Sequence, residues 1–254
     1  MKKVIGAGLI ILFAGRSQEL EKSWRFGFVG GGHLCWLKSE MGEMLKNEGV
    51  RFGYSFGLYV EKMLSENGRY SIETGLHFNR FGIKVSYIDI ATPTNDTIKF
   101  QTDPTYATYT YGYVSLPAIL KMRTNEIGGM RYYIGFGFSL SGRWRASLLR
   151  EDNYHPTPQE TRTLTQELEK YNKTAFFRIS MIIKGGLEYN MTGTTWLIAS
   201  LYFDNGLTNM FGSNEKIPQK SGNLIKNFPN PKPEDYLRME GRVNWVGISV
   251  GFLF

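Results

Sequence analysis

The chain has 254 residues, of which 42% are hydrophobic, 15% are aromatic and 29 are glycine, and its formal net charge is +7. The single cysteine, Cys35, excludes an internal disulfide and a CxxC metal site. The Lys and Arg residues lie singly within strand-like segments and form no basic cluster, which argues against nucleic-acid binding.

The N-terminal residues have the pattern of a secretory signal peptide. Lys2 and Lys3 supply positive charge, residues 4–15 are mostly apolar, and small residues follow at 15–18. The apolar run is shorter than the ~20 residues of a membrane-spanning helix, and no cysteine follows it as in a lipoprotein. We expect residues 1–17 to be removed and residues 18–254 to form a single domain.

Most of the remaining chain alternates apolar with polar or small residues, which is the period of a β-strand. The second such segment is the clearest, because Phe52, Tyr54 and Phe56 alternate with Gly53 and Ser55. We predict eight strands, at residues 24–37, 51–61, 69–85, 106–122, 131–143, 177–188, 197–204 and 242–254.

Three further features of the sequence predict local departures from regular strands. The alternation shifts phase near Phe81, which predicts a β-bulge in the third strand. Pro117 lies within the fourth strand, where it lacks a ladder donor, so we expect a local irregularity there. Leu164 and Leu168 are four residues apart in a polar stretch, a spacing that favours a short helix.

The connections alternate between short and long. Residues 65–68, 124–129 and 190–193 are short and rich in Asn and Gly, as in tight turns. Residues 38–50, 86–105, 146–174 and 208–241 are long and carry the Pro, Asn, Lys and Glu content of exposed loops. An even number of antiparallel strands with this alternation is typical of a bacterial outer-membrane barrel.

Alternation alone leaves two barrels open: a lipocalin-like barrel with its apolar row inside, and an outer-membrane barrel with that row facing lipid. The polar rows combine Gly with Arg and Glu. Glycine weakens a solvent-exposed strand, whereas inside an eight-stranded barrel it makes room for long charged side chains. We therefore predict an all-β, eight-stranded antiparallel up-and-down outer-membrane barrel, with short periplasmic turns, four long external loops and both termini in the periplasm.

In this arrangement the charged residues of the polar rows face the lumen, and since unpaired buried charges are costly they should pair across strands. The predicted lumen is filled and is not an open pore. The last strand presents Ile248, Val250, Phe252 and Phe254 on one face, the C-terminal pattern used in barrel assembly. The predicted lumenal network comprises Arg25, Arg51, Glu61, Glu73, Arg131, Arg143, Arg178, Lys184, Glu188 and Asp204.

No catalytic motif is present in the sequence. His33, His77 and His155 lack metal-ligand spacing, and no phosphate-binding loop, dinucleotide fingerprint or nucleophile elbow occurs. We therefore assign no catalytic, cofactor-binding or metal-binding residue. His77 and Glu73 share one strand face, for which we favour lumenal packing over catalysis.

Several segments resemble the PorT-like family of small outer-membrane β-barrel proteins of Bacteroidota, over essentially the whole mature chain. The segments are residues 26–30, 36–39, 113–128, 185–189 and 203–208, and the most specific is the Leu116-Pro117 strand that leads into Thr124-Asn-Glu-Ile-Gly128. The resemblance implies that Pro117 is a normal feature of the fold. The family's namesake takes part in type IX secretion, and the resemblance transfers no catalytic residue.

The sequence therefore predicts a monomeric, non-enzymatic outer-membrane barrel with a structural or accessory role in the envelope, which includes support of type IX-like secretion or assembly. The expected partners are outer-membrane lipid and lipopolysaccharide, the barrel-assembly machinery during insertion, and secretion or envelope proteins. A narrow transport pore and a lipid-modifying enzyme stay open as alternatives.

Overall fold

The computed structural model describes residues 24–87, 104–152, 162–167, 173–218, 220–221, 224–225 and 236–254. The predicted signal peptide lies outside the described residues. No helix in these ranges has the length and apolar character needed to cross a membrane.

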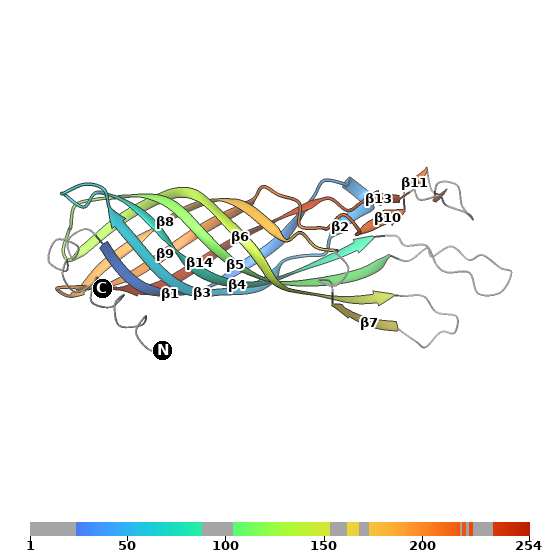
Figure 1. Ribbon diagram of the computed structural model, residues 1–254, viewed down its shortest axis with the longest axis horizontal. Coiled ribbons are helices and arrows are strands. Elements are labelled where there is room, and N and C mark those ends of the chain that lie inside the picture. Colours follow the sequence, from blue (N-terminus) through green and yellow to red (C-terminus); the bar gives the residue numbers. More distant parts are fainter. Residues whose placement is uncertain are drawn as a thin grey trace, which may run out of the picture.

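Eight long antiparallel strands form a closed barrel (Figure 1). Each strand pairs with its neighbours around the wall in the order β1-β3-β4-β5-β6-β8-β9-β14, and β14 pairs with β1 to close it. This confirms the predicted fold class. The eight strands are β1 (Trp24–Ser39), β3 (Arg51–Met63), β4 (Tyr70–Tyr87), β5 (Thr105–Arg123), β6 (Met130–Asp152), β8 (Phe177–Thr192), β9 (Thr195–Gly206) and β14 (Gly241–Leu253).

Short elements occupy the end of the barrel with the long connections, which we call the loop end. They are the 3-10 helix η1 (Gly42–Met44), β2 (Leu45–Asn47), β7 (Arg162–Glu167), β10 (Lys216–Pro218), β11 (Lys220–Ser221), β12 (Leu224–Ile225) and β13 (Tyr236–Arg238). β7 pairs with the end of β6. The short helix expected from Leu164 and Leu168 is therefore wrong for residues 162–167, because that segment is a strand paired with β6; Leu168 lies outside the described residues.

The opposite end, which we call the turn end, carries the tight connections and the C-terminus (Figure 1). The strands β8 and β9 are separated by only two residues, Gly193 and Thr194, and Gly193 has a φ of 52°. A positive φ in a two-residue hairpin is easily adopted by glycine. The alternation of short and long connections predicted from the sequence is therefore present among the described residues.

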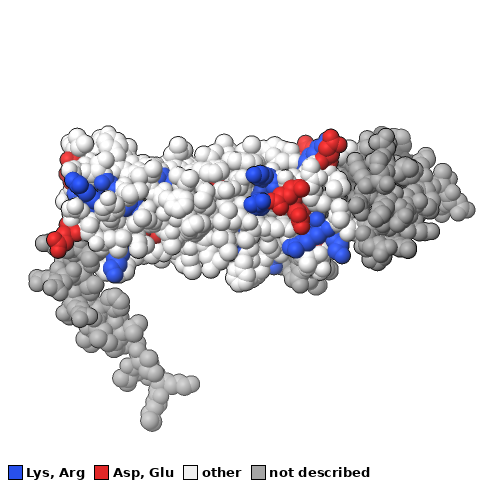
Figure 2. All heavy atoms as spheres, turned by 90° about the horizontal axis from the view of Figure 1, so that it is seen from above, with Lys and Arg blue, Asp and Glu red and all other residues white. Residues whose placement is uncertain are grey.

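A broad apolar band surrounds the barrel wall. Its side chains are exposed, so the band requires an apolar solvent around it. Figure 2 shows the same division on one face, where Lys, Arg, Asp and Glu gather mainly near the two ends. The outward rows cover residues 52–60, 70–78, 114–122, 132–140 and 246–254, nine residues each, as a transmembrane strand requires.

Beyond the band, the strands β4, β5 and β6 continue toward the loop end with the opposite polarity (Figure 1). Phe81, Ile83 and Val85 are buried inside, whereas Arg80 and Lys84 lie on the outer face. The register between β4 and β5 is constant through this stretch. The predicted bulge at Phe81 is therefore wrong. Beyond the apolar band the outer face of the wall is in water, so the apolar side chains lie on the inner face.

The register shift of this wall lies instead in β6. Gly112 pairs with Arg145 and Tyr113 pairs with Arg143, which leaves Trp144 without an opposite residue. Because of this extra residue, the inward positions of β6 change from odd numbers, such as Ser141, to even numbers, such as Ala146.

The irregularity predicted at Pro117 is confirmed. Pairing between β4 and β5 is interrupted after Glu73 and Ile119 and resumes at His77 and Ser115 with the same register. Pro117 lies in this gap, and it still faces Ser139 of β6. The missing N–H of proline is accommodated by losing part of one ladder while the other ladder is kept.

Candidate functional site

The barrel interior near the turn end contains a layer of buried ion pairs centred on Glu188 of β8. We call Arg25, Glu61, Lys121, Arg123 and Glu188 the ionic layer. Arg25 donates to Glu188 Oε2 from its two terminal guanidinium nitrogens, at 3.1 and 3.0 Å, and Arg123 Nε lies 2.9 Å from Oε1. Lys121 also pairs with Glu188. One carboxylate therefore pairs with three cations from two other strands, β1 and β5.

Glu61 of β3 is the second carboxylate of the ionic layer. It pairs with Arg123, lies 3.1 Å from Arg25 and 3.6 Å from Lys121, and accepts a 2.5 Å hydrogen bond from Ser71. The sequence folds this way because the register places Arg25 directly opposite Glu61 on the inward face. The interior of an eight-stranded barrel is only wide enough for side chains, so the pairs fill its cross-section.

Glu73 and Lys184 form the next level toward the loop end. They pair with each other, and the hydroxyl of Tyr59 donates to Glu73 Oε2 at 2.8 Å. Lys121 donates to the same Tyr59 hydroxyl at 3.0 Å, which connects this level to the ionic layer. Both levels together place four cations opposite three carboxylates in the described interior.

A further ion pair joins Arg178 of β8 and Asp204 of β9, deeper toward the loop end. Arg178 also donates to the carbonyl of Val243 at 3.0 Å, and its guanidinium lies 4.0 Å from the centre of the Trp245 ring. Ser180 donates to the second oxygen of Asp204 at 2.9 Å. Both oxygens of this buried carboxylate are therefore satisfied.

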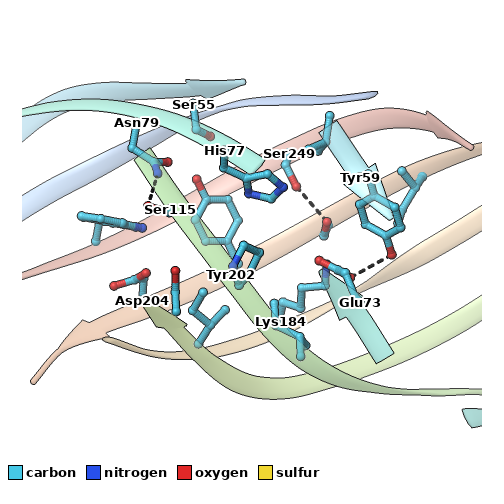
Figure 3. Close-up of a pocket in the computed structure, with 18 residues that line it drawn as sticks. Ser55, Tyr59, Glu73, His77, Asn79, Ser115, Lys184, Tyr202, Asp204 and Ser249 are labelled. Atoms are coloured by element: carbon cyan, nitrogen blue, oxygen red, sulfur yellow. Dashed lines mark hydrogen bonds and ion pairs between the residues drawn. The ribbon is translucent and has the colours of Figure 1, made fainter. Parts of the chain in front are cut away.

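A small cavity of about 70 Å³ lies between the levels of Lys184 and Asp204. Figure 3 shows His77, Tyr202 and Lys184 converging on it from β4, β9 and β8. A bound water needs at least ~10–15 Å³ of cavity volume, so this cavity has room for only a few water molecules. His77 Nε2 has no partner within the described residues, which makes it a natural bonding group for such a water.

The loop end of the interior is filled by an apolar layer of aromatic side chains. Tyr109, Tyr111, Phe81 and Phe211 are at most 1% exposed, and the Phe211 ring meets the Tyr109 ring edge-on at 5.3 Å. The Tyr109 hydroxyl donates to Glu215 at 2.8 Å, so the segment after β9 is held against the strands. The lumen is thus obstructed at both levels, by ion pairs and by packed rings.

Seven of the ten predicted lumenal charges lie in the interior: Arg25, Glu61, Glu73, Arg178, Lys184, Glu188 and Asp204. The structure places the other three elsewhere. Arg131 lies at the turn-end rim, where it pairs with Glu126 at 3.0 Å. Arg51 and Arg143 lie toward the loop end, where they donate to Thr108 at 3.2 Å and to the Thr174 carbonyl at 2.7 Å.

Two central cations of the ionic layer, Lys121 and Arg123, are absent from the predicted network. Lys121 lies on the polar face of the predicted fourth strand, and Arg123 follows on that face two residues later. Extending the alternation by one position beyond the predicted strand end identifies Arg123. The C-terminal residues Ile248 and Phe254 are 64% and 57% exposed on the outer wall, and Val250 and Phe252 share that face.

Metal-ligating side chains are not grouped in the described part of the barrel interior. No group of three or more His, Cys, Asp or Glu suited to a metal ion occurs in the part of the chain that the structure describes. Cys35 is fully buried, and its Sγ lies 3.0 and 3.2 Å from the carbonyl oxygens of Arg51 and Gly82. The arrangement can hold charge and water, and it binds the strands together.

Comparison with known proteins identifies the family. Residues 16–212 match the family described as outer membrane protein beta-barrel domain. No curated protein matches the chain.

Similar solved structures are distant in sequence. Neisserial surface protein A (NspA) is 10% identical, with a TM-score of 0.43 over 90% of this chain and 95% of that one. Ail, the attachment invasion locus protein of Yersinia pestis, is 12% identical, with a TM-score of 0.35 over 91% and 99%. The N-terminal β-barrel domain of Pseudomonas aeruginosa OprF is 14% identical, with a TM-score of 0.30 over 90% and 99%. With most of its length matched by the family and a closed eight-stranded barrel as its fold, the chain belongs to the outer membrane protein beta-barrel domain family and is a small outer-membrane barrel.

Proposed function

We propose that the protein is a non-conducting and non-enzymatic monomer that serves the outer membrane as a structural or accessory protein. The observation that carries this proposal is the doubly obstructed lumen. The ionic layer fills the turn end, and the aromatic layer fills the loop end. Since the interior is closed, the working surfaces are the outer wall and the connections at the two ends.

The alternative of a narrow pore makes a distinct prediction. Conduction requires that ions displace the pairs around Glu188 and also pass the rings of Tyr109 and Phe211. Separating buried ion pairs costs several kcal/mol for each ion. We expect purified protein in planar lipid bilayers to show no single-channel steps. Regular conductance steps that disappear in protein-free controls would refute the proposal.

The alternative of a lipid-modifying enzyme is tested in cells. Overexpression of an enzyme of this class changes the mass of lipid A. We expect unchanged lipid A by mass spectrometry in cells that overproduce the folded protein. A new lipid A species that depends on this chain would contradict the non-enzymatic assignment.

The orientation and the accessory role are further parts of the proposal. A signal peptide at residues 1–17, with the short turns and both termini in the periplasm and the loop end outside, is supported by the N-terminal pattern and the connection lengths. The PorT-like resemblance supports a role in type IX-like secretion or assembly. The exposed face of β14, with Ile248 and Phe252, supports recognition by the barrel-assembly machinery.

Copurification separates a solitary barrel from an accessory subunit. The tagged protein is extracted from native outer membranes in mild detergent, and its partners are identified by mass spectrometry. Secretion or assembly components in stoichiometric amounts are the expected result for an accessory subunit. Recovery of the barrel alone would remove the secretion role and leave a self-sufficient envelope protein.

A further inference from the structure

A cluster of cations lies on the outer wall at the edge of the apolar band, on the loop-end side. It consists of Arg51 of β3, Arg80 and Lys84 of β4, and Arg145 of β6, and we call it the basic wall patch. On β4 the outward row passes directly from the exposed Phe78 to the exposed Arg80. The patch therefore begins where the wall leaves the hydrocarbon region.

Strand pairing brings the two exposed arginines of the patch together. Arg80 pairs with Gly112 of β5, and Gly112 pairs with Arg145 on its other side. The two arginines are thus two strand spacings apart, or roughly 10 Å between backbones. Both side chains are long enough to reach a ligand above Gly112.

Trp144 supplies a third group at this point. It is the unpaired residue of the β6 bulge and is 55% exposed. A Cβ on Gly112 would lie only 2.6 Å from the indole Nε1, so the indole covers Gly112 in place of a side chain there. A tryptophan at this level suits a membrane interface, where its ring meets lipid and its N–H meets polar groups.

The wall is hollowed on both sides of Arg80. One hollow of about 230 Å³ is lined by Arg51, Tyr54, Arg80 and Thr108, among others. A second hollow of about 50 Å³ lies between Arg80, Trp144 and Arg145. None of the residues that line either hollow is acidic. The two hollows thus combine guanidinium groups with hydroxyl and indole donors.

The cations of the patch lack acidic partners in the described part of the chain. Arg51 donates to Thr108, and the ammonium of Lys84 lies 5.0 Å from the centre of the Tyr106 ring. In contrast, Arg242 at the same end of the barrel pairs with Glu40. Unpaired exposed arginines around a hollow are free to meet an anionic ligand.

Glu48 is the acidic group to be considered near this wall, because its N–H donates to the Lys84 carbonyl at 2.8 Å. Its carboxylate accepts a 2.5 Å hydrogen bond from the buried Ser86. This carboxylate is therefore engaged with another group and forms no ion pair with Lys84.

We propose that the basic wall patch binds the phosphate groups of lipid A-type lipids in the adjoining leaflet. The lipid's acyl chains would lie along the apolar rows of β4 and β5, and its phosphates would meet Arg80 and Arg145. Arginine suits this ligand because its planar fork binds phosphate oxygens in pairs. The assignment of the leaflet rests on the orientation proposed above, with the loop end outside.

Lipid binding to the purified full-length protein tests the site. The barrel is refolded into a maltoside detergent, and native mass spectrometry measures binding of bisphosphorylated lipid A, the same lipid without phosphates, and inorganic phosphate. We expect binding of the bisphosphorylated lipid only. In R80Q/R145Q its dissociation constant should rise about tenfold or more, as expected on losing charge-assisted hydrogen bonds.

The matched control is K38Q/R242Q, which removes two outward cations from the same end on β1 and β14. This variant should change the dissociation constant by less than about threefold, because both cations lie outside the proposed site and Arg242 is already paired with Glu40. Arg80 and Arg145 are exposed, so R80Q/R145Q should fold; if it does not, the single variants R80Q and R145Q carry the test.

Three results would overturn the proposal. Equal losses of lipid affinity in both double variants would show that binding is general charge attraction. If the lipid without phosphates bound as well as the bisphosphorylated lipid, the contact would be with the acyl chains only. If inorganic phosphate bound equally strongly, the patch would be a free-anion site. Binding in detergent does not depend on orientation in the cell. Labelling of single cysteines introduced at the loop end, on intact cells, tests the orientation separately, so the two proposals fail independently.

Discussion

The ionic layer predicts a large stability effect for a single substitution, E188Q. The change removes one charge and leaves Arg25, Lys121 and Arg123 in place, and the side chains of Lys121 and Arg123 are fully buried. Removing one partner of a buried ion pair costs about 3–5 kcal/mol. We therefore expect the free energy of unfolding to fall by about this amount, since Glu61 alone cannot neutralise three cations.

Urea unfolding of the barrel in lipid vesicles, followed by tryptophan fluorescence, measures this loss. The control E126Q breaks a rim pair whose side chains are 29% and 39% exposed, so it should cost less than about 1 kcal/mol. The double variant E188Q/K121M removes one charge of each sign, and should recover at least about 1 kcal/mol relative to the sum of the single variants. A loss below about 1 kcal/mol for E188Q, or simple additivity in the double variant, would refute the reasoning.

Three other perturbations have defined outcomes. G137A should lower the free energy of unfolding by about 1–3 kcal/mol, because its Cβ would lie 2.1 Å from the Ala118 carbonyl oxygen. The Cβ of the control G142A, on the same strand, meets nothing within 4 Å, so this variant should change the free energy by no more than about 0.5 kcal/mol. Equal effects of the two variants in urea titrations would contradict this prediction. F136R, in the middle of an apolar row, should lower the free energy of unfolding by about 2–4 kcal/mol, whereas L64R, beyond the end of β3, should lower it by about 0–1 kcal/mol. The same titrations check that F136R is the more destabilising of the two. The thiol of Cys35 should resist maleimide in the folded barrel and react in urea, as followed by mass spectrometry; rapid labelling of folded protein would show that its burial is wrong.

Most of the strand pattern could be predicted from the sequence, because each position in the barrel wall faces either the lipid or the barrel interior. Phe52, Tyr54 and Phe56 alternate with Gly53 and Ser55, and the structure places the first set outside. The prediction at Phe81 failed because it assumed one polarity along the whole strand. Where β4 leaves the apolar surroundings, inward and outward preferences exchange without any change of register.

The candidate site was less predictable than the fold. Alternation assigns a charged residue to the inner face, but it does not say which other charge it will meet. Arg131 and Arg143 share the inward pattern with Ser139, yet Arg131 lies at the rim and Arg143 contacts Thr174. Their position along the barrel axis depends on strand tilt and stagger, which one strand's sequence does not contain.

The sequence by itself determined the number of strands, the lipid-facing rows and the tight turns. These are local properties, because alternation and turn chemistry act within a few residues. The tertiary structure alone decided that Arg25 meets Glu188, 163 positions away, and that Arg80 and Arg145 flank Gly112. Such contacts arise only when closure and shear fix all eight strands relative to one another, and that is a property of the whole barrel.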